Sequence, residues 1–416
     1  ADMFFSLLYN AITVYGIDGD VLIDSLFSRP TGRASLELAT GFINDIFLTH
    51  GSFEGSFRGG DILIDSLKFL SKDNAIILGG SVDIAAESTL VDLLRLDFQL
   101  QNFALNAAEP VELKWLRDTL FVDALNLQNK TQTGLVSGSG FWCFDSSNTV
   151  FNAQLLDIPI DPVNDYHYLR YALNGTIDSD VEIYGLIDSL EILTGLELKE
   201  LFLIDRDSLI APQPLGTLQS EVLYAANRLG INFLNYEQDD NSFLTLNGSV
   251  DFSIQGGDSL APTPLDLKLI AERLSLERYR PFLRTNFPLE GNVSGRAELK
   301  GTTAQPELYM TLRGDSLRYA EYRMPELRFI LNGDGNGIVL DSGYANYINT
   351  DINFVGTKKL SWEPGNTESL FADSTFEIVA TIREDSLNFL NSINPELDII
   401  TGDIRADITL GGTFQT

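Results

Sequence analysis

The sequence predicts an all-β fold, an elongated antiparallel β-taco: a trough or groove built from repeats, with an apolar inner face and few short helices. Three observations predict it. Apolar and polar residues alternate with a period of two, turn sequences separate the alternating segments, and a glycine-framed pattern recurs along the chain. Helical periodicity is confined to short stretches at residues 164–171, 276–283 and 386–392.

The alternating segments predict strands with one apolar and one polar face. In residues 250–255 every second residue is apolar, starting at Val250, and Asp, Ser and Gln lie between them. The same pattern recurs at residues 76–84, 308–312, 327–331 and 376–382. Because successive side chains of a strand point to opposite faces, each segment would have one dry and one wet face.

Glycine-rich turn sequences lie between these segments. They are Asn247-Gly248, residues 332–337 and Gly59-Gly60-Asp61. Asn-Gly and Asp-Gly pairs adopt the positive φ angles of tight hairpins, so antiparallel meanders are expected. Residues 332–337 also imitate the opening of a calcium loop. However, the twelfth position is Gly343 and no helical pattern flanks the run, so we predict a hairpin turn there.

One pattern occurs three times, at residues 173–185, 289–301 and 400–412, each time with two glycines ten residues apart. The copies start 116 and 111 residues apart. Length alone would suggest two or three domains, but a repeat predicts a stacked, quasi-one-dimensional structure. We therefore predict one continuous segment over residues 1–416 with repeat units of about 60–185, 186–301 and 302–412. We expect it to be a piece of a larger protein.

Composition indicates a folded protein with an acidic surface. The chain is 44% hydrophobic and carries 28 Lys and Arg against 59 Asp and Glu, a net charge of −31. Such a surface repels nucleic acid phosphates and anionic lipid headgroups, so we expect neither a nucleic acid partner nor docking on an anionic headgroup surface. The single cysteine, Cys143, excludes an intrachain disulfide and leaves the cytosol and a bacterial periplasm equally open. No apolar run reaches the length of a membrane-spanning helix.

Residues that could carry catalysis are sparse. The two histidines are His50, in an expected turn, and His167, between two tyrosines, and neither lies in a pattern typical of a triad or a metal site. Cys143 has aromatic neighbours and no basic one, which indicates a buried structural thiol. We expect no enzyme activity, no catalytic residues, no metal and no cofactor. A β-rich polysaccharide-acting enzyme is a minor alternative, because nothing in the spacing singles out a carboxylate pair.

A single open sheet with one apolar face would expose far more apolar surface than a soluble monomer tolerates. It can close into a barrel, fold so that its sides fill each other, or curl into a trough that holds an apolar ligand. The repeat disfavours a single closed barrel. A trough is the favoured reading, and a closed β-solenoid or adhesin-like stalk, with the same residues as a dry core, is the alternative.

One stretch resembles a known family. It runs Leu265-Asp-Leu-Lys-Leu through Pro281 to Leu289-Glu-Gly-Asn-Val-Ser-Gly295, and ends Gly301-Thr-Thr-Ala-Gln-Pro306. This order of strand, Pro-containing loop, Leu-x-Gly-x-Val-x-Gly and Gly-Thr-x-x-x-Pro is similar to the repeat of the TamB family of bacterial envelope proteins. The pattern is shared with the wider AsmA-like group. The resemblance is strong over residues 243–416 and weaker but continuous before them.

The resemblance implies a periplasmic β-groove that binds phospholipids and conducts their acyl chains between the inner and outer membranes, with a further link to outer-membrane protein assembly. It implies attachment to the inner membrane through an N-terminal segment absent from this chain, and an Omp85-class (TamA-like) outer-membrane partner. The residues expected to line the groove are Val250, Phe252, Ile254, Val293, Ala297, Leu299, Leu308, Met310, Leu312, Leu327, Phe329, Phe376, Ile378 and Ile382.

Overall fold

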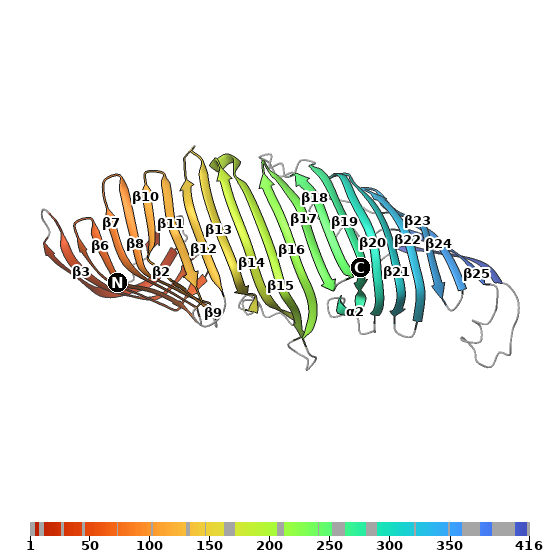
Figure 1. The fold of residues 1–416 in the computed structure, drawn as a ribbon, viewed down its shortest axis with the longest axis horizontal. Helices are drawn as coiled ribbons and strands as arrows, with labels where there is room; N and C mark the ends of the chain where they lie inside the picture. Colours follow the sequence, from red (N-terminus) through yellow and green to blue (C-terminus); the bar gives the residue numbers. More distant parts are fainter. Residues whose placement is uncertain are drawn as a thin grey trace. The chain divides into compact units, whose positions relative to one another are not determined.

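A computed structural model describes most of the chain: residues 5–7, 12–25, 29–43, 46–72, 74–100, 103–129, 134–145, 147–161, 171–205, 212–239, 241–251, 263–279, 289–319, 322–347, 350–359, 375–384 and 404–413. The fold is all-β and antiparallel, with almost no helix, as the alternation predicted (Figure 1). The chain divides into two compact units, unit 1 (Ala1–Pro212) and unit 2 (Gln213–Thr416). The predicted repeat boundaries stay a prediction.

Unit 1 contains fifteen described strands and one 3-10 turn. They are β1 (Phe5–Leu7), β2 (Ile12–Ser25), β3 (Thr31–Ile43), β4 (Ile46–Leu48), β5 (His50–Arg58), β6 (Asp61–Ser71), β7 (Asn74–Ile84), β8 (Ser88–Leu100), β9 (Phe103–Ala107), β10 (Val111–Leu116), β11 (Thr119–Gln128), β12 (Leu135–Cys143), β13 (Thr149–Pro159), β14 (Tyr171–Gly185), η1 (Ile187–Ser189) and β15 (Glu191–Asp205).

Unit 2 contains eleven described strands and one short helix. They are β16 (Gln213–Ala225), β17 (Arg228–Asp239), β18 (Ser242–Asp251), β19 (Pro264–Ser275), α2 (Leu276–Tyr279), β20 (Leu289–Thr302), β21 (Pro306–Tyr319), β22 (Tyr322–Asp334), β23 (Gly337–Tyr347), β24 (Thr350–Lys359), β25 (Thr375–Glu384) and β26 (Ile404–Thr413). Each strand pairs with the next in sequence, so this unit is an antiparallel meander from β16 to β26.

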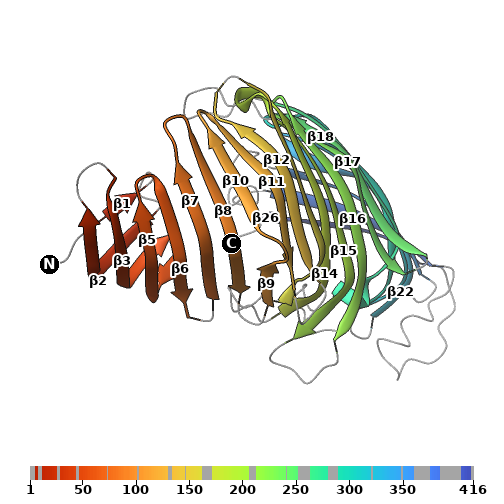
Figure 2. The same cartoon turned by 60° about the vertical axis from the view of Figure 1, so that its left-hand side comes forward.

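Unit 1 follows the same meander with two interruptions among its described strands. The two ends of β3 pair with different strands, β4 at one end and β5 at the other. The two ends of β8 pair with different strands, β9 at one end and β10 at the other, and both then pair with β11 (Figure 2). The segment between β9 and β10 ends in Pro110, which has no N–H to donate to a ladder. Several of the most buried apolar side chains of unit 1 gather at this break: Leu93, Phe103, Leu105 and Val111.

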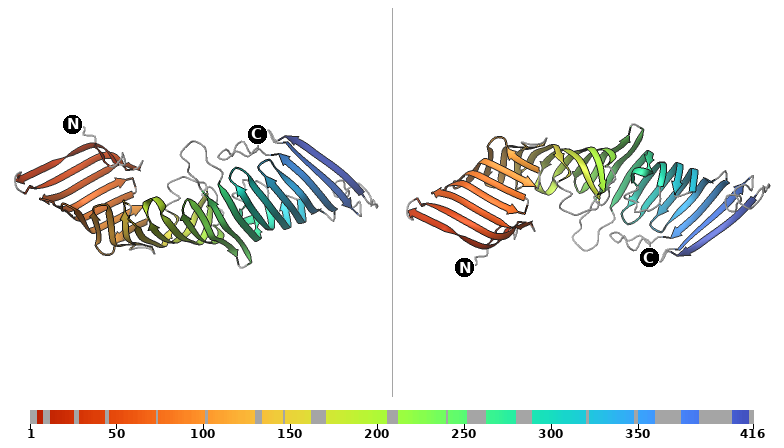
Figure 3. Two further views of the ribbon diagram at one scale, coloured as in Figure 1. Left: turned by 90° about the horizontal axis from the view of Figure 1, so that it is seen from above. Right: turned by 90° about the horizontal axis from the view of Figure 1, so that it is seen from below.

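No layer of helices covers the strands of either unit in the described part of the chain (Figures 1 and 3). Residues 276–279 of the expected 276–283 helix form α2, and residues 280–283 lie outside the described residues. Of the stretch 164–171, only Tyr171 is described, and it begins β14. Residues 386–392 also lie outside the described part.

Two of the three predicted turns are confirmed. Gly59 and Gly60 connect β5 to β6, and Gly335 and Asn336 connect β22 to β23. In the second turn the Asp334 carboxylate accepts hydrogen bonds from the N–H groups of Asn336 (2.8 Å) and Gly337 (3.0 Å). The prediction of a turn at Asn247-Gly248 is wrong, because both residues lie inside β18, where Gly248 faces the backbone of β19.

The same unusual backbone conformations occur at equivalent positions of the two units. In unit 1, Asp157, Gly175, Gly185 and Glu200 have positive φ; in unit 2, Arg273, Gly291, Gly301 and Ser316 do, each 116 residues after its counterpart. Three of the four pairs coincide with interruptions of the strand register, and such β-bulges bend and twist a strand. The glycines of the first two predicted frames therefore occupy positions where the backbone leaves the extended conformation.

Candidate functional site

Register places the predicted groove residues together. Residues directly opposite each other on neighbouring strands share a face, and Leu299 lies opposite both Leu267 and Leu308. We call the face of unit 2 that carries Leu299 its apolar face, and the other its polar face. The described groove candidates all lie on this apolar face: Val250, Val293, Ala297, Leu299, Leu308, Met310, Leu312, Leu327, Phe329, Phe376, Ile378 and Ile382. Phe252 and Ile254 lie outside the described residues.

The apolar face of unit 2 contains an uncharged row that crosses every strand of the unit. From β16 to β26 the facing residues are Leu218, Tyr236, Leu244, Ala271, Gly295, Leu312, Phe329, Gly343, Phe354, Ala380 and Ile408. We call this the unit 2 row. The hydroxyl of Tyr236, its one polar side-chain group, donates to the backbone oxygen of Leu215.

Unit 1 has a corresponding row on the face that we call its apolar face. Across β2, β3, β5–β8 and β10–β15 the facing residues are Ile23, Gly32, Phe57, Ile62, Val82, Val91, Leu113, Val122, Gly140, Phe151, Ile183 and Ile192. We call this the unit 1 row. None of these residues is among the groove candidates from the sequence, although Val82 lies in the alternating segment 76–84. The interrupted register of several strands shifts their parity and hides the row.

Most side chains of these rows are partly exposed, whereas Ala271 is buried and Ile23 and Ile408 are exposed. The twelve described groove candidates are all partly exposed. On the last described strand, β26, Ile408 is 42% and Leu410 is 56% exposed. A protein core packs such side chains out of contact with water, so the described residues leave this apolar surface only partly covered.

Two glycines, one on the apolar face of each unit, lie under aromatic rings. A Cβ placed at Gly343 would overlap the Phe354 ring of the next strand, and one at Gly32 would overlap the Phe57 ring. Such rings shield a strand glycine, which has no side chain of its own to pack. The pattern keeps the face apolar where side chains are missing.

Charge enters the apolar face of unit 2 at the strand ends. Lys358, near the end of β24, lies opposite Ile338 and Phe376 and is partly exposed. A lysine stem can pack on apolar neighbours while its ammonium group reaches water. The rows through the middle of the strands contain no such group.

Side chains on the polar face accept hydrogen bonds from backbone N–H groups at the bulges. In unit 1 the N–H of Asp157 donates to the Asp178 carboxylate (2.7 Å), and in unit 2 the N–H of Arg273 donates to the Ser294 hydroxyl (2.9 Å). Each pair is 116 residues from the other, so two different side chains fill one structural position. Lys199 also hydrogen-bonds Asp178 and lies within 4.0 Å of Asp157 and Glu197.

We expect the Asp178 contact to give unit 1 an acid-sensitive stability. Partial burial raises the pKa of Asp178, but hydrogen bonds from Lys199 and the Asp157 N–H, with the charge of Lys199, outweigh it and hold the pKa below its usual value. The folded pKa is below the unfolded one, so the contribution is complete above pH about 4 and disappears as the pH falls through the folded pKa.

Asp178→Ala should lower the free energy of unfolding by about 1–2 kcal/mol at pH 7, and the deficit should shrink at pH 3. Ser294→Ala removes the uncharged acceptor at the equivalent position of unit 2. Its loss of unfolding free energy should be the same at pH 7 and at pH 3. Urea unfolding of both variants measures this. A deficit for Asp178→Ala that is the same at pH 7 and pH 3 would contradict the assignment.

The histidine and cysteine residues that could carry catalysis do not lie together in the described part of the chain. His50 begins β5 rather than occupying a turn, and His167 lies outside the described residues. Cys143 is buried, as predicted, and its N–H donates to the Thr149 hydroxyl (3.0 Å). Within the described ranges no group of three or more His, Cys, Asp or Glu is placed to hold a metal ion. No described helix is long and apolar enough to cross a membrane.

Comparisons of the chain with protein-family models, with curated proteins and with solved structures find no match.

Proposed function

We propose that the apolar faces of this protein bind the acyl chains of phospholipids and conduct them from strand to strand. The observation that carries the proposal is the pair of uncharged rows, which cross all eleven strands of unit 2 and most strands of unit 1. With strands about 4.8 Å apart, eleven strands offer a strip about 48 Å long within unit 2.

The driving force is the transfer of apolar surface out of water. Each methylene group moved onto an apolar surface gains up to about 0.8 kcal/mol, and the partly exposed side chains of the face gain as well. Because successive positions of each row are chemically alike, an acyl chain can move to the next strand without meeting a charge. No bond is made or broken, and the protein is not an enzyme in this proposal.

Partial exposure supports a ligand-binding trough over the alternative of a self-filled stalk. In a closed β-solenoid the groove candidates would form a dry interior, whereas Leu308, Met310 and Leu312 are partly exposed. The recurrence of bulges at a 116-residue offset supports a repeating architecture with bends at fixed positions. We also propose that the trough is taco-shaped.

The cellular setting rests on the resemblance to the TamB family. We propose a periplasmic location with attachment to the inner membrane through a segment outside this chain. The same resemblance supports an Omp85-class outer-membrane partner and a contribution to outer-membrane protein assembly.

Face-resolved photo-crosslinking tests the proposal. A photoreactive amino acid replaces, one at a time, six consecutive residues of β21, at positions 308–313. Crosslinks to phospholipid in membrane-containing extracts are expected at Leu308, Met310 and Leu312 and at background level at Tyr309, Thr311 and Arg313, since the two sets point to opposite faces. Equal labelling of both sets, or none, would refute an acyl-chain face.

A further inference from the structure

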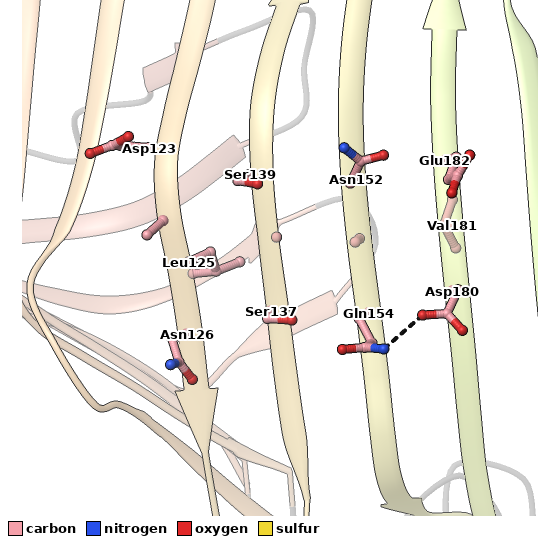
Figure 4. A pocket seen from close by; sticks show the side chains of 13 residues that line it. Asp123, Leu125, Asn126, Ser137, Ser139, Asn152, Gln154, Asp180, Val181 and Glu182 are labelled. Atoms are coloured by element: carbon pink, nitrogen blue, oxygen red, sulfur yellow. Dashed lines mark hydrogen bonds between the residues drawn. The ribbon is translucent and has the colours of Figure 1, made fainter.

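The polar face of unit 1, opposite its apolar face, carries a hollow of about 490 Å³ over β11–β14 (Figure 4). Its polar side chains come from all four strands and combine amides, hydroxyls and carboxylates. They are Asp123, Asn126, Ser137, Ser139, Asn152, Gln154, Asp180 and Glu182. Two cross-strand rows form it, Asn126–Ser137–Gln154–Asp180 and Ser139–Asn152–Glu182.

One contact in the hollow is preformed. The Gln154 amide nitrogen donates to the Asp180 carboxylate (2.8 Å), which leaves the Gln154 carbonyl oxygen and the second Asp180 oxygen as acceptors (Figure 4). Asn152 is exposed beside them. The hollow thus presents donors and acceptors from different strands, and the Gln154–Asp180 hydrogen bond orients two of them.

An aromatic row borders the hollow on the same face. It runs Phe121–Phe141–Val150–Tyr184, two residues further along each of β12, β13 and β14, or about 7 Å away. The rings of Phe121 and Phe141 lie 5.9 Å apart, and Tyr184 is 41% exposed. The contact between Phe121 and Phe141 is an ordinary cross-strand pair and needs no ligand to explain it. The hollow therefore has an apolar border in addition to its hydrogen-bonding groups.

We propose that this hollow binds a neutral oligosaccharide. A sugar hydroxyl both donates and accepts, which amides, hydroxyls and carboxylates can match, and the C–H face of a sugar ring packs on an aromatic side chain. Asp123, Asp180 and Glu182 disfavour an anionic ligand. Four strands span about 14 Å, the length of about three sugar units.

Two other ligands fit the chemistry less well. A metal ion would need converging carboxylates, and within the described residues no such group of three or more is present. A basic peptide would match the three acidic residues, but it leaves the amides and the aromatic row without a role. The site lies on the face opposite the acyl-chain rows and is independent of the proposed function.

The test is calorimetric titration of the full chain with chitotriose, cellotriose and maltotriose in turn. At least one should bind with a Kd in the millimolar range or tighter, and the Asn152→Ala/Gln154→Ala variant should weaken it about tenfold or more. Tyr184→Ala, which removes an exposed ring and no hydrogen bond of the hollow, should weaken binding too. Asn235→Ala, a polar-face variant of β17 in unit 2, should bind as the unaltered chain does.

Three outcomes would overturn the site. No binding of any trisaccharide at about 10 mM would exclude a useful affinity. Undiminished binding by both the double variant and Tyr184→Ala, with circular dichroism unchanged, would place the sugar elsewhere. Binding of a lysine-rich peptide or of calcium ions that the double variant abolishes, without sugar binding, would assign the hollow to a cation.

Discussion

Gly248→Ala should destabilise unit 2 severely, by about 3 kcal/mol or more. Gly248 has a φ of 134° inside β18, and a Cβ there would overlap the backbone oxygen of Asp266 and lie 2.8 Å from the Leu267 Cα. Neither neighbour can move without breaking the β18–β19 ladder, where Gly248 pairs with Leu267. Urea unfolding should show a much lower midpoint for the transition of unit 2.

Gly230→Ala is the matched control. Gly230 lies in β17, the neighbour of β18, and the nearest atom to a Cβ there is the Leu223 oxygen at 3.6 Å, an ordinary contact. The free energy of unfolding should change by less than about 1 kcal/mol. Similar losses for the two variants would mean that Gly248 is not needed for close approach of the strands.

Met310→Asp should lower the affinity of unit 2 for phospholipid by roughly tenfold or more, because a carboxylate in contact with an acyl chain loses its hydration without gaining a partner. Met310 lies between Ala297 and Leu331 in the middle of the apolar face. Titration of the purified chain with a fluorescent phospholipid measures the affinity.

Thr311→Asp introduces the same charge one residue further on. Thr311 lies on the polar face, opposite Arg296 and Ile330, so affinity should stay within about twofold of the unaltered chain. Met310→Gln, which is polar but uncharged, separates an effect on binding from loss of folding. Equal losses for Met310→Asp and Thr311→Asp would remove the distinction between the faces.

The strands themselves could be predicted from period-two alternation, because side chains at every second position must share a face. Residues 76–84, 308–312, 327–331 and 376–382 all lie inside single strands. The turn at Gly335 and Asn336 followed from its residues, since the Asp334 carboxylate caps the N–H groups that the turn leaves unpaired.

Glycine was the less reliable signal. Asn247-Gly248 has the composition of a tight turn, but the positive φ of Gly248 serves the close approach of two strands. The sequence does not separate the two uses, because both need a residue without a Cβ and only the partner strand distinguishes them.

Bulges limited the prediction of the site. In β21, Ser316 has a φ of 55° inside the strand. Leu317 then folds over Gly314, so the side chain that packs there is not the one that strict alternation selects. A one-residue shift in pleat moves side chains to the other face, which alternation within one strand cannot reveal.

The central claim is that the apolar rows carry lipid, and native mass spectrometry of the purified chain, combined with lipid extraction, tests it most directly. The chain should carry several phospholipids, fewer in Met310→Asp and as many in Thr311→Asp. A chain that is folded, monodisperse and free of lipid would contradict the claim and favour a self-filled β-stalk.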